Sequence, residues 1–173
     1  MACNLTEGLT LGCKDSQGGI EYLYMADLPS GAIPVVDADD IITGYQDAAG
    51  DPVALTFFKF EVPKQTSGLT TTINADNAAG TVFYDQAVTF VFNKITADIR
   101  NQILLIAQNP RIFVVVKDGN GLFHGVGATR GAEISAGTMQ TGIAYGDRNG
   151  GELTITGLEP DPPYIVDAAF VGE

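Results

Sequence analysis

The segment from Val88 to Gly127 constrains the fold most, because the spacing of its apolar residues changes twice along it. Val88–Phe92 is β-branched and aromatic, which favours a buried strand. Isoleucines then recur at the spacing of one face of an α-helix, at positions 95, 99, 103 and 106. Thr96 is placed to cap this helix and Asn109-Pro110 to end it, so we predict a single helix over residues 95–108.

The rest of the chain has the alternation of β-strands and the punctuation of turns. Arg111–Lys117 is apolar through its centre, and Asp118–Gly121 favours a hairpin turn into Leu122–Val126. The doubled Phe57-Phe58 breaks an alternating run and indicates a bulge or a bend. Further strands are predicted at residues 20–25, 35–43 (as two short strands), 54–62, 69–73, 81–92, 133–145 and 152–157. The chain is therefore predicted to be mainly β.

The length predicts one domain over residues 1–173, with an extended N-terminal arm (1–19) and a C-terminal tail (158–173). Three prolines between residues 160 and 163 are expected to end regular structure, and the apolar tail beyond them to dock on a neighbouring subunit. No stretch approaches the ~18 apolar residues of a membrane span. The N-terminus lacks the basic and apolar regions of a secretory signal, so we expect none and regard the glycosylation sequon Asn4-Leu5-Thr6 as incidental.

The charge balance excludes one class of function. Nine lysines and arginines against 21 aspartates and glutamates give a net charge of −12. Such a chain repels phosphate, which argues against a protein that grips duplex DNA. Solubility alone accounts for this charge equally well.

The residue types that carry chemistry occur without the spacing that a site needs. Cys3 and Cys13 are the only cysteines, match no zinc-binding pattern, and form either two reduced thiols or a local disulfide. His124 is the only histidine and is predicted to be an ordinary strand residue.

Two polar clusters are predicted to be turns. Asp37, Asp39 and Asp40 would attract Ca²⁺, but the glycine and distal glutamate of a calcium-binding loop are missing, so a solvated acidic turn is favoured. Turn chemistry explains every residue of Gly146–Gly151. We therefore predict no catalytic, cofactor-binding or metal-binding residue and no cofactor, and we do not expect an enzyme.

Three segments resemble virion structural proteins of tailed bacteriophages, in particular those of phages infecting Bacteroidota. They are Cys3–Gly19, Thr81–Gln108 and Ala144–Gly157. The order strand, helix, strand, flanked by further strands, is similar to that of tail tube proteins. The resemblance implies two packed antiparallel sheets, as a β-sandwich or barrel, with one flanking α-helix. It also implies hexameric rings that stack into a conduit for DNA. The family has no active-site residues to carry over.

The resemblance also implies partners and a location. The partners would be further copies of the chain, other tail proteins, and double-stranded DNA that passes without specific binding. The location would be the virion tail, after synthesis in the host cytoplasm. Two alternative functions remain. One is another virion component, namely a tail-completion, neck or capsid-decoration protein, and the other is a non-viral β-sandwich binding module.

Three strands are candidates for the inner sheet of such a ring: 54–62, 69–73 and 81–92. A DNA conduit should have an acidic or neutral lining. Lys59 would therefore need a carboxylate partner, such as Asp85 or Glu61 of an adjacent copy. The polar segment 63–80 is the expected contact between rings.

Overall fold

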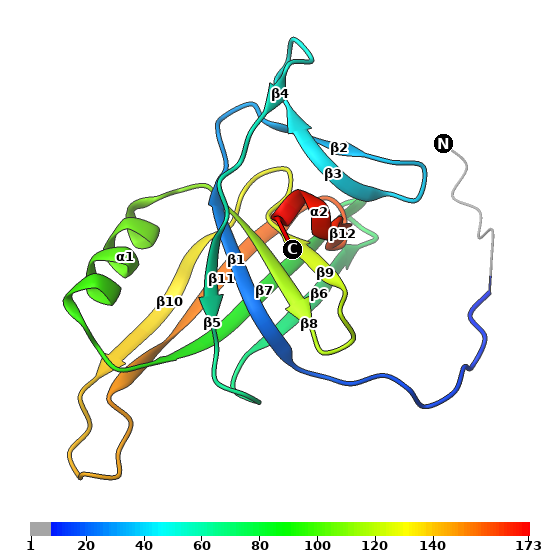
Figure 1. Ribbon diagram of the computed structural model, residues 1–173. Coiled ribbons are helices and arrows are strands. Elements are labelled where there is room, and N and C mark those ends of the chain that lie inside the picture. Colours follow the sequence, from blue (N-terminus) through cyan, green and yellow to red (C-terminus); the bar gives the residue numbers. More distant parts are fainter. Residues whose placement is uncertain (1–7) are drawn as a thin grey trace.

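The computed structural model describes residues 8–173 and consists of two mainly antiparallel sheets packed face to face, with two helices (Figure 1). The prediction of a mainly β fold with two packed sheets is confirmed. The large sheet has the strand order β2-β3-β12-β9-β8-β1-β5, with β4 beside β3. Its strands are β1 (Ile20–Asp27), β2 (Ile33–Val36), β3 (Ile41–Gln46), β4 (Pro52–Val53), β5 (Phe58–Glu61), β8 (Ile112–Asp118), β9 (Phe123–Val126) and β12 (Tyr164–Val166).

The small sheet has the order β10-β11-β7-β6. Its strands are β6 (Gly68–Asp76), β7 (Thr81–Asn93), β10 (Glu133–Gln140) and β11 (Gly150–Glu159). β7 and β11 pair over ten residues and form the centre of this sheet. The predicted strand at 69–73 is the exposed edge strand β6, and the predicted strand at 81–92 is β7.

The main core fills the space between the two sheets. The large sheet contributes Leu23, Met25 and Val114, and the small sheet contributes Val88 and Ile155, all of them buried. Alternate residues of β7 and β11 point inward, as strand periodicity requires. Leu153 and Ile155 of the predicted strand 152–157 are among these inward residues and are buried.

A second core lies on the opposite face of the large sheet. Its centre is Phe113, which is fully buried against Tyr45 and Phe57 at ring-centroid distances of 5.3 and 6.1 Å. β8 is therefore covered on both faces, and this explains why Val114–Val116 reads as one unbroken apolar run instead of alternating.

The predicted helix is confirmed as α1 (Ala97–Gln108). The Thr96 hydroxyl accepts a hydrogen bond from the Ile99 backbone N–H at 3.2 Å, which makes Thr96 the N-cap. The helix lies at the side of the sandwich, next to β5 and β10 (Figure 1). The side chains of its isoleucine stripe face the main core but stay half-buried, because the helix stands off from the sheets.

The expectation for the C-terminal tail is wrong. The prolines do end β11, but Tyr164–Val166 forms β12 inside the large sheet, and a second helix, α2 (Ala168–Val171), follows. The physical reason is that Val166 and Val171 complete the second core of their own chain. The tail therefore docks on its own domain and not on a neighbour.

Two predicted strands are shorter than expected. The run 54–62 is regular only over β5, because Phe57 turns into the second core where the sequence indicated a bend. The run 133–145 stops at Gln140, since Gly142 has a left-handed φ of +77° and starts a loop. Ile143 and Tyr145, at the end of the predicted strand, lie fully exposed in that loop.

Candidate functional site

The small sheet differs from the rest of the chain in its charges. Its four strands contain no lysine, arginine or histidine. They do contain five acidic residues, Asp76, Asp85, Glu133, Glu152 and Glu159, of which Glu159 is buried. Every basic residue of the described chain therefore lies in the large sheet, in α1, in the loops or in the arm.

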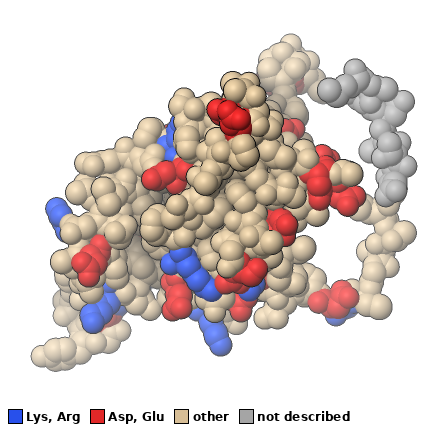
Figure 2. Space-filling model, turned by 45° about the horizontal axis from the view of Figure 1, so that its top comes forward, with Lys and Arg blue, Asp and Glu red and all other residues tan. Residues whose placement is uncertain are grey.

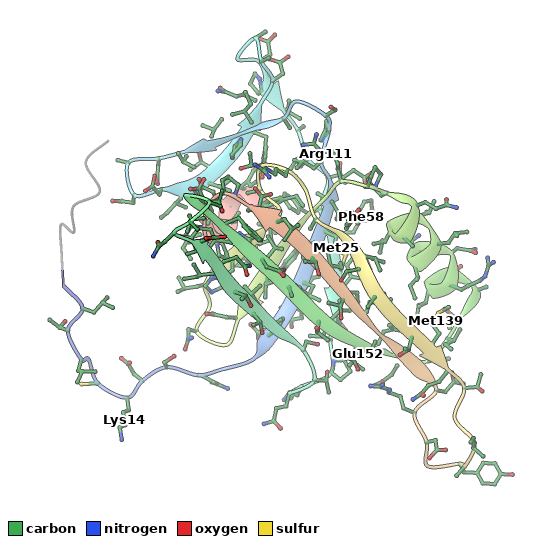
Figure 3. All side chains as sticks on the ribbon, turned by 180° about the vertical axis from the view of Figure 1, so that it is seen from behind. Lys14, Met25, Phe58, Arg111, Met139 and Glu152 are labelled. Carbon is green, nitrogen blue, oxygen red and sulfur yellow. The ribbon has the colours of Figure 1, made fainter. Side chains whose placement is uncertain are left out.

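The side of the small sheet that faces away from the main core is rich in hydroxyl groups. We call it the hydroxyl face. Its polar and small residues are Thr70, Thr72, Asp85, Ala87, Thr89, Glu133, Ser135, Glu152, Thr154 and Thr156, and the apolar side chains of Phe83, Val91 and Leu158 lie on the same side. Figure 3 views the molecule from this side, with Glu152 on β11 and the arm residue Lys14 far from it.

Hydroxyl groups on this face bond to one another across the strands. The Thr89 and Thr154 hydroxyls lie 3.3 Å apart, and the Ser135 and Thr156 hydroxyls lie 2.7 Å apart. These pairs satisfy each other, so the face presents uncharged hydroxyl groups, three carboxylates and the partly exposed apolar side chains of Phe83 and Leu158.

Both outer strands of the small sheet have an unpaired edge in the described chain. β6 pairs only with β7, and β10 pairs only with β11. Neither strand carries the lysine or proline with which proteins commonly block edge-to-edge pairing. The two edges are therefore chemically able to accept a further strand.

The three strands predicted to form one inner sheet do not lie together. β6 and β7 are neighbours in the small sheet, whereas β5 lies at the edge of the large sheet. Lys59 of β5 is consequently not on the hydroxyl face. Its partner is neither Asp85 nor a neighbour's Glu61, because its Nζ lies 2.6 Å from Glu173 Oε1 of the same chain.

Glu173 joins two strands of the large sheet to the C-terminus. Its second oxygen lies 2.9 Å from Lys117 Nζ on β8. The Lys59 ammonium also lies 3.8 Å from the ring centroid of Tyr22, a cation–π contact. Hydrogen bonding, with Lys59 as the largest contributor and Tyr24 and Lys117 after it, lowers the pKa of Glu173 from its ordinary value of 4.5 to about 2.

We expect Glu173→Gln to lower the Tm at pH 7 and to flatten the decline of Tm in acid. A carboxyl whose pKa is lowered by folding stabilises the fold above its unfolded pKa, and this contribution is lost as the pH falls from about 4.5 to about 2. Thermal melts from pH 7 to pH 2 test the effect. Glu21→Gln is the control, since Glu21 is more exposed and lies 3.5 Å from Lys117. If the Tm of Glu173→Gln declined in acid as steeply as the Tm of the wild type, this role of Glu173 would be contradicted.

The predicted turns hold their acidic residues as acceptors for the backbone. Asp37 Oδ1 accepts from the N–H groups of Asp39 and Ile41, which confirms the acidic turn between β2 and β3. Asp147 accepts from Ile143 and Ala144, and these backbone hydrogen bonds lower its pKa. Both clusters are thus explained by turn geometry.

His124 is a strand residue of β9, as predicted, and its Nε2 lies 3.1 Å from Asp118 Oδ2. Asp118 also accepts from the N–H groups of Asn120 and Leu122 in the hairpin turn. Burial opposes ionisation of Asp118, but the hydrogen bonds from His124, Leu122 and Asn120 outweigh it and lower its pKa. The pair therefore holds the β8–β9 hairpin together.

Two buried polar residues were not anticipated from the sequence. Gln86 Oε1 accepts from the Gly127 N–H at 3.2 Å, and Glu159 Oε1 accepts from Thr129 and Arg130 at 3.1 and 2.8 Å. Together they fasten the β9–β10 loop to the small sheet. Burial raises the pKa of Glu159, although the backbone N–H groups oppose that shift. The only signal in the sequence is that both residues occupy inward positions of apolar strands.

Cys13 is exposed on the arm, while Cys3 and the sequon at residues 4–6 lie outside the described residues. Within residues 8–173 no three histidine, cysteine or acidic side chains gather as a metal site would require. Neither helix of that part of the chain has the length and apolarity to cross a membrane. Comparison of the chain with protein-family models, with curated proteins and with solved structures gives no match.

Proposed function

We propose that the protein is the structural subunit of a phage tail tube, in which rings of the chain stack into a conduit for DNA. The observation that carries the proposal is the hydroxyl face, a broad sheet surface with three carboxylates and no basic residue. In this arrangement the hydroxyl face lines the conduit.

The charges of this face suit the passage of DNA. Lysine and arginine bind phosphate and release counterions, so a lining that carries them would retain the duplex. Hydroxyl groups and scattered carboxylates give DNA no such attachment. Acidic side chains also outnumber basic ones in the whole chain, and both kinds are visible on the face shown in Figure 2. The hydroxyl face therefore differs from the rest of the surface by the complete lack of cations in its strands and not by net charge alone.

The two free edges of the small sheet supply a means of closing a ring. If β6 of one copy pairs with β10 of the next, the small sheets continue from subunit to subunit and the ring leaves no edge of the small sheet open. The segment before β6 and the turn between β6 and β7 then lie at the ends of the ring, where they contact the next ring along the tube.

Electron microscopy of the purified protein tests the proposal. Rings or tubes with a central channel support it. A monomer, or trimers that bind to capsid shells, would contradict it and favour a binding module or a decoration protein.

A charge substitution tests which face lines the channel. Thr72→Lys adds a cation to the hydroxyl face, and we expect assembled tubes of this variant to bind short duplex DNA at least about tenfold more tightly than wild-type tubes at low salt. Thr43→Lys is the matched control, because Thr43 is an exposed threonine of β3 in the other sheet. Filter binding at several salt concentrations measures the difference. Equal affinities for the two variants would show that the hydroxyl face does not line the channel.

A further inference from the structure

An apolar groove opens between α1 and the edge of the large sheet. Its volume is about 510 Å³. Its walls are formed by Phe60 of β5, Val62 just after that strand, Phe92 of β7, and the helix residues Ile99, Ile103 and Ile106. These side chains belong to the main core or pack against it, and the isoleucines stay half-buried because nothing fills the groove. A second hollow continues along the helix past Phe60, Gln102 and Ile106 to the exposed Phe58 and Leu105.

One wall of the groove is an open strand edge. β5 ends the large sheet and pairs only with β1 in the described chain, so the backbone groups of Phe58–Glu61 on the other side have no strand partner. A segment entering beside β5 would add a strand to the sheet and place alternate side chains into the apolar space.

The arm has the residues that such a position requires. Gly8–Gly12 reads Gly-Leu-Thr-Leu-Gly, which alternates as a strand does. Leu9 and Leu11 are fully exposed, at 105% and 106%, and touch no part of their own domain. In an extended chain they would point to one side, about 7 Å apart, with Thr10 on the other side.

The base of the arm directs it away from its own groove. The Gln17 N–H donates to Asn120 Oδ1 at 2.7 Å, and the Gly119 N–H donates to the Gly19 carbonyl at 3.0 Å. These bonds fix the arm to the β8–β9 turn, and beyond them it extends from the side of the molecule opposite α1 (Figure 1). The arm of another copy is therefore better placed to reach the groove than the arm of the same copy.

We propose that Gly8–Gly12 of one copy occupies the groove between α1 and β5 of another copy, with Leu9 and Leu11 buried against the isoleucine stripe. This contact rests on the self-association that the proposed function requires, and it is separate from the β6 and β10 edges. It explains why two leucines stand in solvent on one side of the chain while an apolar hollow stays open on the other.

Disulfide trapping between two differently tagged, full-length variants tests the contact. Both variants carry Cys3→Ser and Cys13→Ser; one also carries Leu11→Cys and the other Gln102→Cys, at a residue that lines both hollows. We expect mild oxidation to give a mixed dimer. The matched control replaces Gln102→Cys by Asn101→Cys, the exposed preceding residue of the same helix, and should give at least about tenfold less dimer.

Two outcomes would overturn the contact. One is equal dimer yield with residues 101 and 102. The other is an internal disulfide in a chain carrying both Leu11→Cys and Gln102→Cys, which would mean that the arm folds back on its own domain.

A second measurement links the contact to assembly. In sedimentation, the double variant Leu9→Asp, Leu11→Asp should form assemblies of lower mass than those of the wild type. Thr10→Asp, on the opposite side of the arm, should form assemblies of wild-type mass. If micrographs show tubes while both variants assemble normally, this contact is wrong and the proposed function stands. If the wild type is monomeric in micrographs and gives no mixed dimer, both fail.

Discussion

Phe113→Ala is expected to lower the free energy of unfolding by about 3–5 kcal/mol, the usual cost of removing a fully buried phenylalanine. Phe113 has no exposed surface and lies at the centre of the second core. Its ring also makes edge contacts with Tyr45 and Phe57, and such pairs contribute beyond the buried area. Chemical denaturation followed by fluorescence or circular dichroism measures the change.

The control for Phe113→Ala is Phe58→Ala. Phe58 is 61% exposed at the edge strand β5, so its truncation should change the stability of the isolated subunit by no more than about 0.5 kcal/mol. Similar losses from the two substitutions would mean that the second core is not packed as the structure shows.

Gly127→Ala is expected to prevent folding or to destabilise the subunit by several kcal/mol. Gly127 has a φ of +72°, and a Cβ atom there would lie 2.4 Å from the backbone nitrogen of Ala132. The backbone must therefore move, and the Gly127 N–H would lose its hydrogen bond to the buried Gln86. Yield of soluble protein and thermal melting report the effect.

Gly31→Ala is the control for Gly127→Ala, because it changes a glycine of similar backbone conformation without creating a steric clash. Gly31 has a similar φ of +83°, but a Cβ atom there would meet nothing within 4 Å. It should cost only the penalty of a left-handed alanine, about 1–2 kcal/mol. If the two variants lost equal stability, the close approach of Gly127 to Gly131 and Ala132 within the β9–β10 loop would not be needed for folding.

The elements that the sequence predicts well are those whose signal is local. The isoleucine spacing and the Thr96 cap define α1, and the alternation in β7 and β11 identifies inward residues such as Val88 and Ile155. The same signal could not show that the stripe of α1 covers a groove, because periodicity gives the direction of a side chain and not the depth of its burial.

The errors come from contacts distant in sequence. β12 has only three residues and follows a run of prolines, so local pattern favours a loose tail; its strand character depends on pairing with Ile41 and Ile42 and with His124 and Gly125. Phe57 leaves the strand pattern because Phe113 and Phe170 lie in the second core.

The distribution of basic residues can be predicted only in part from the sequence. That basic residues are few is evident from composition, but their exclusion from one sheet requires the strand order. Strand 54–62 was expected beside β6 and β7, which would have brought Lys59 onto the same surface. In the structure β5 pairs with β1 instead, and the small sheet is left without a cation.

The position of β12 between β3 and β9 has a consequence for how the chain folds. The β2–β3–β4 unit joins the other strands of its sheet through this one short strand, whose partner Ile41 precedes it by more than a hundred residues. Such distant pairing makes folding slow, and until β12 arrives the edges of β3 and β9 remain open. During that interval, in concentrated solution, the β12 of a second molecule can insert in its place. Refolding at high concentration is therefore expected to yield domain-swapped dimers through residues 160–171, and dilution should suppress them.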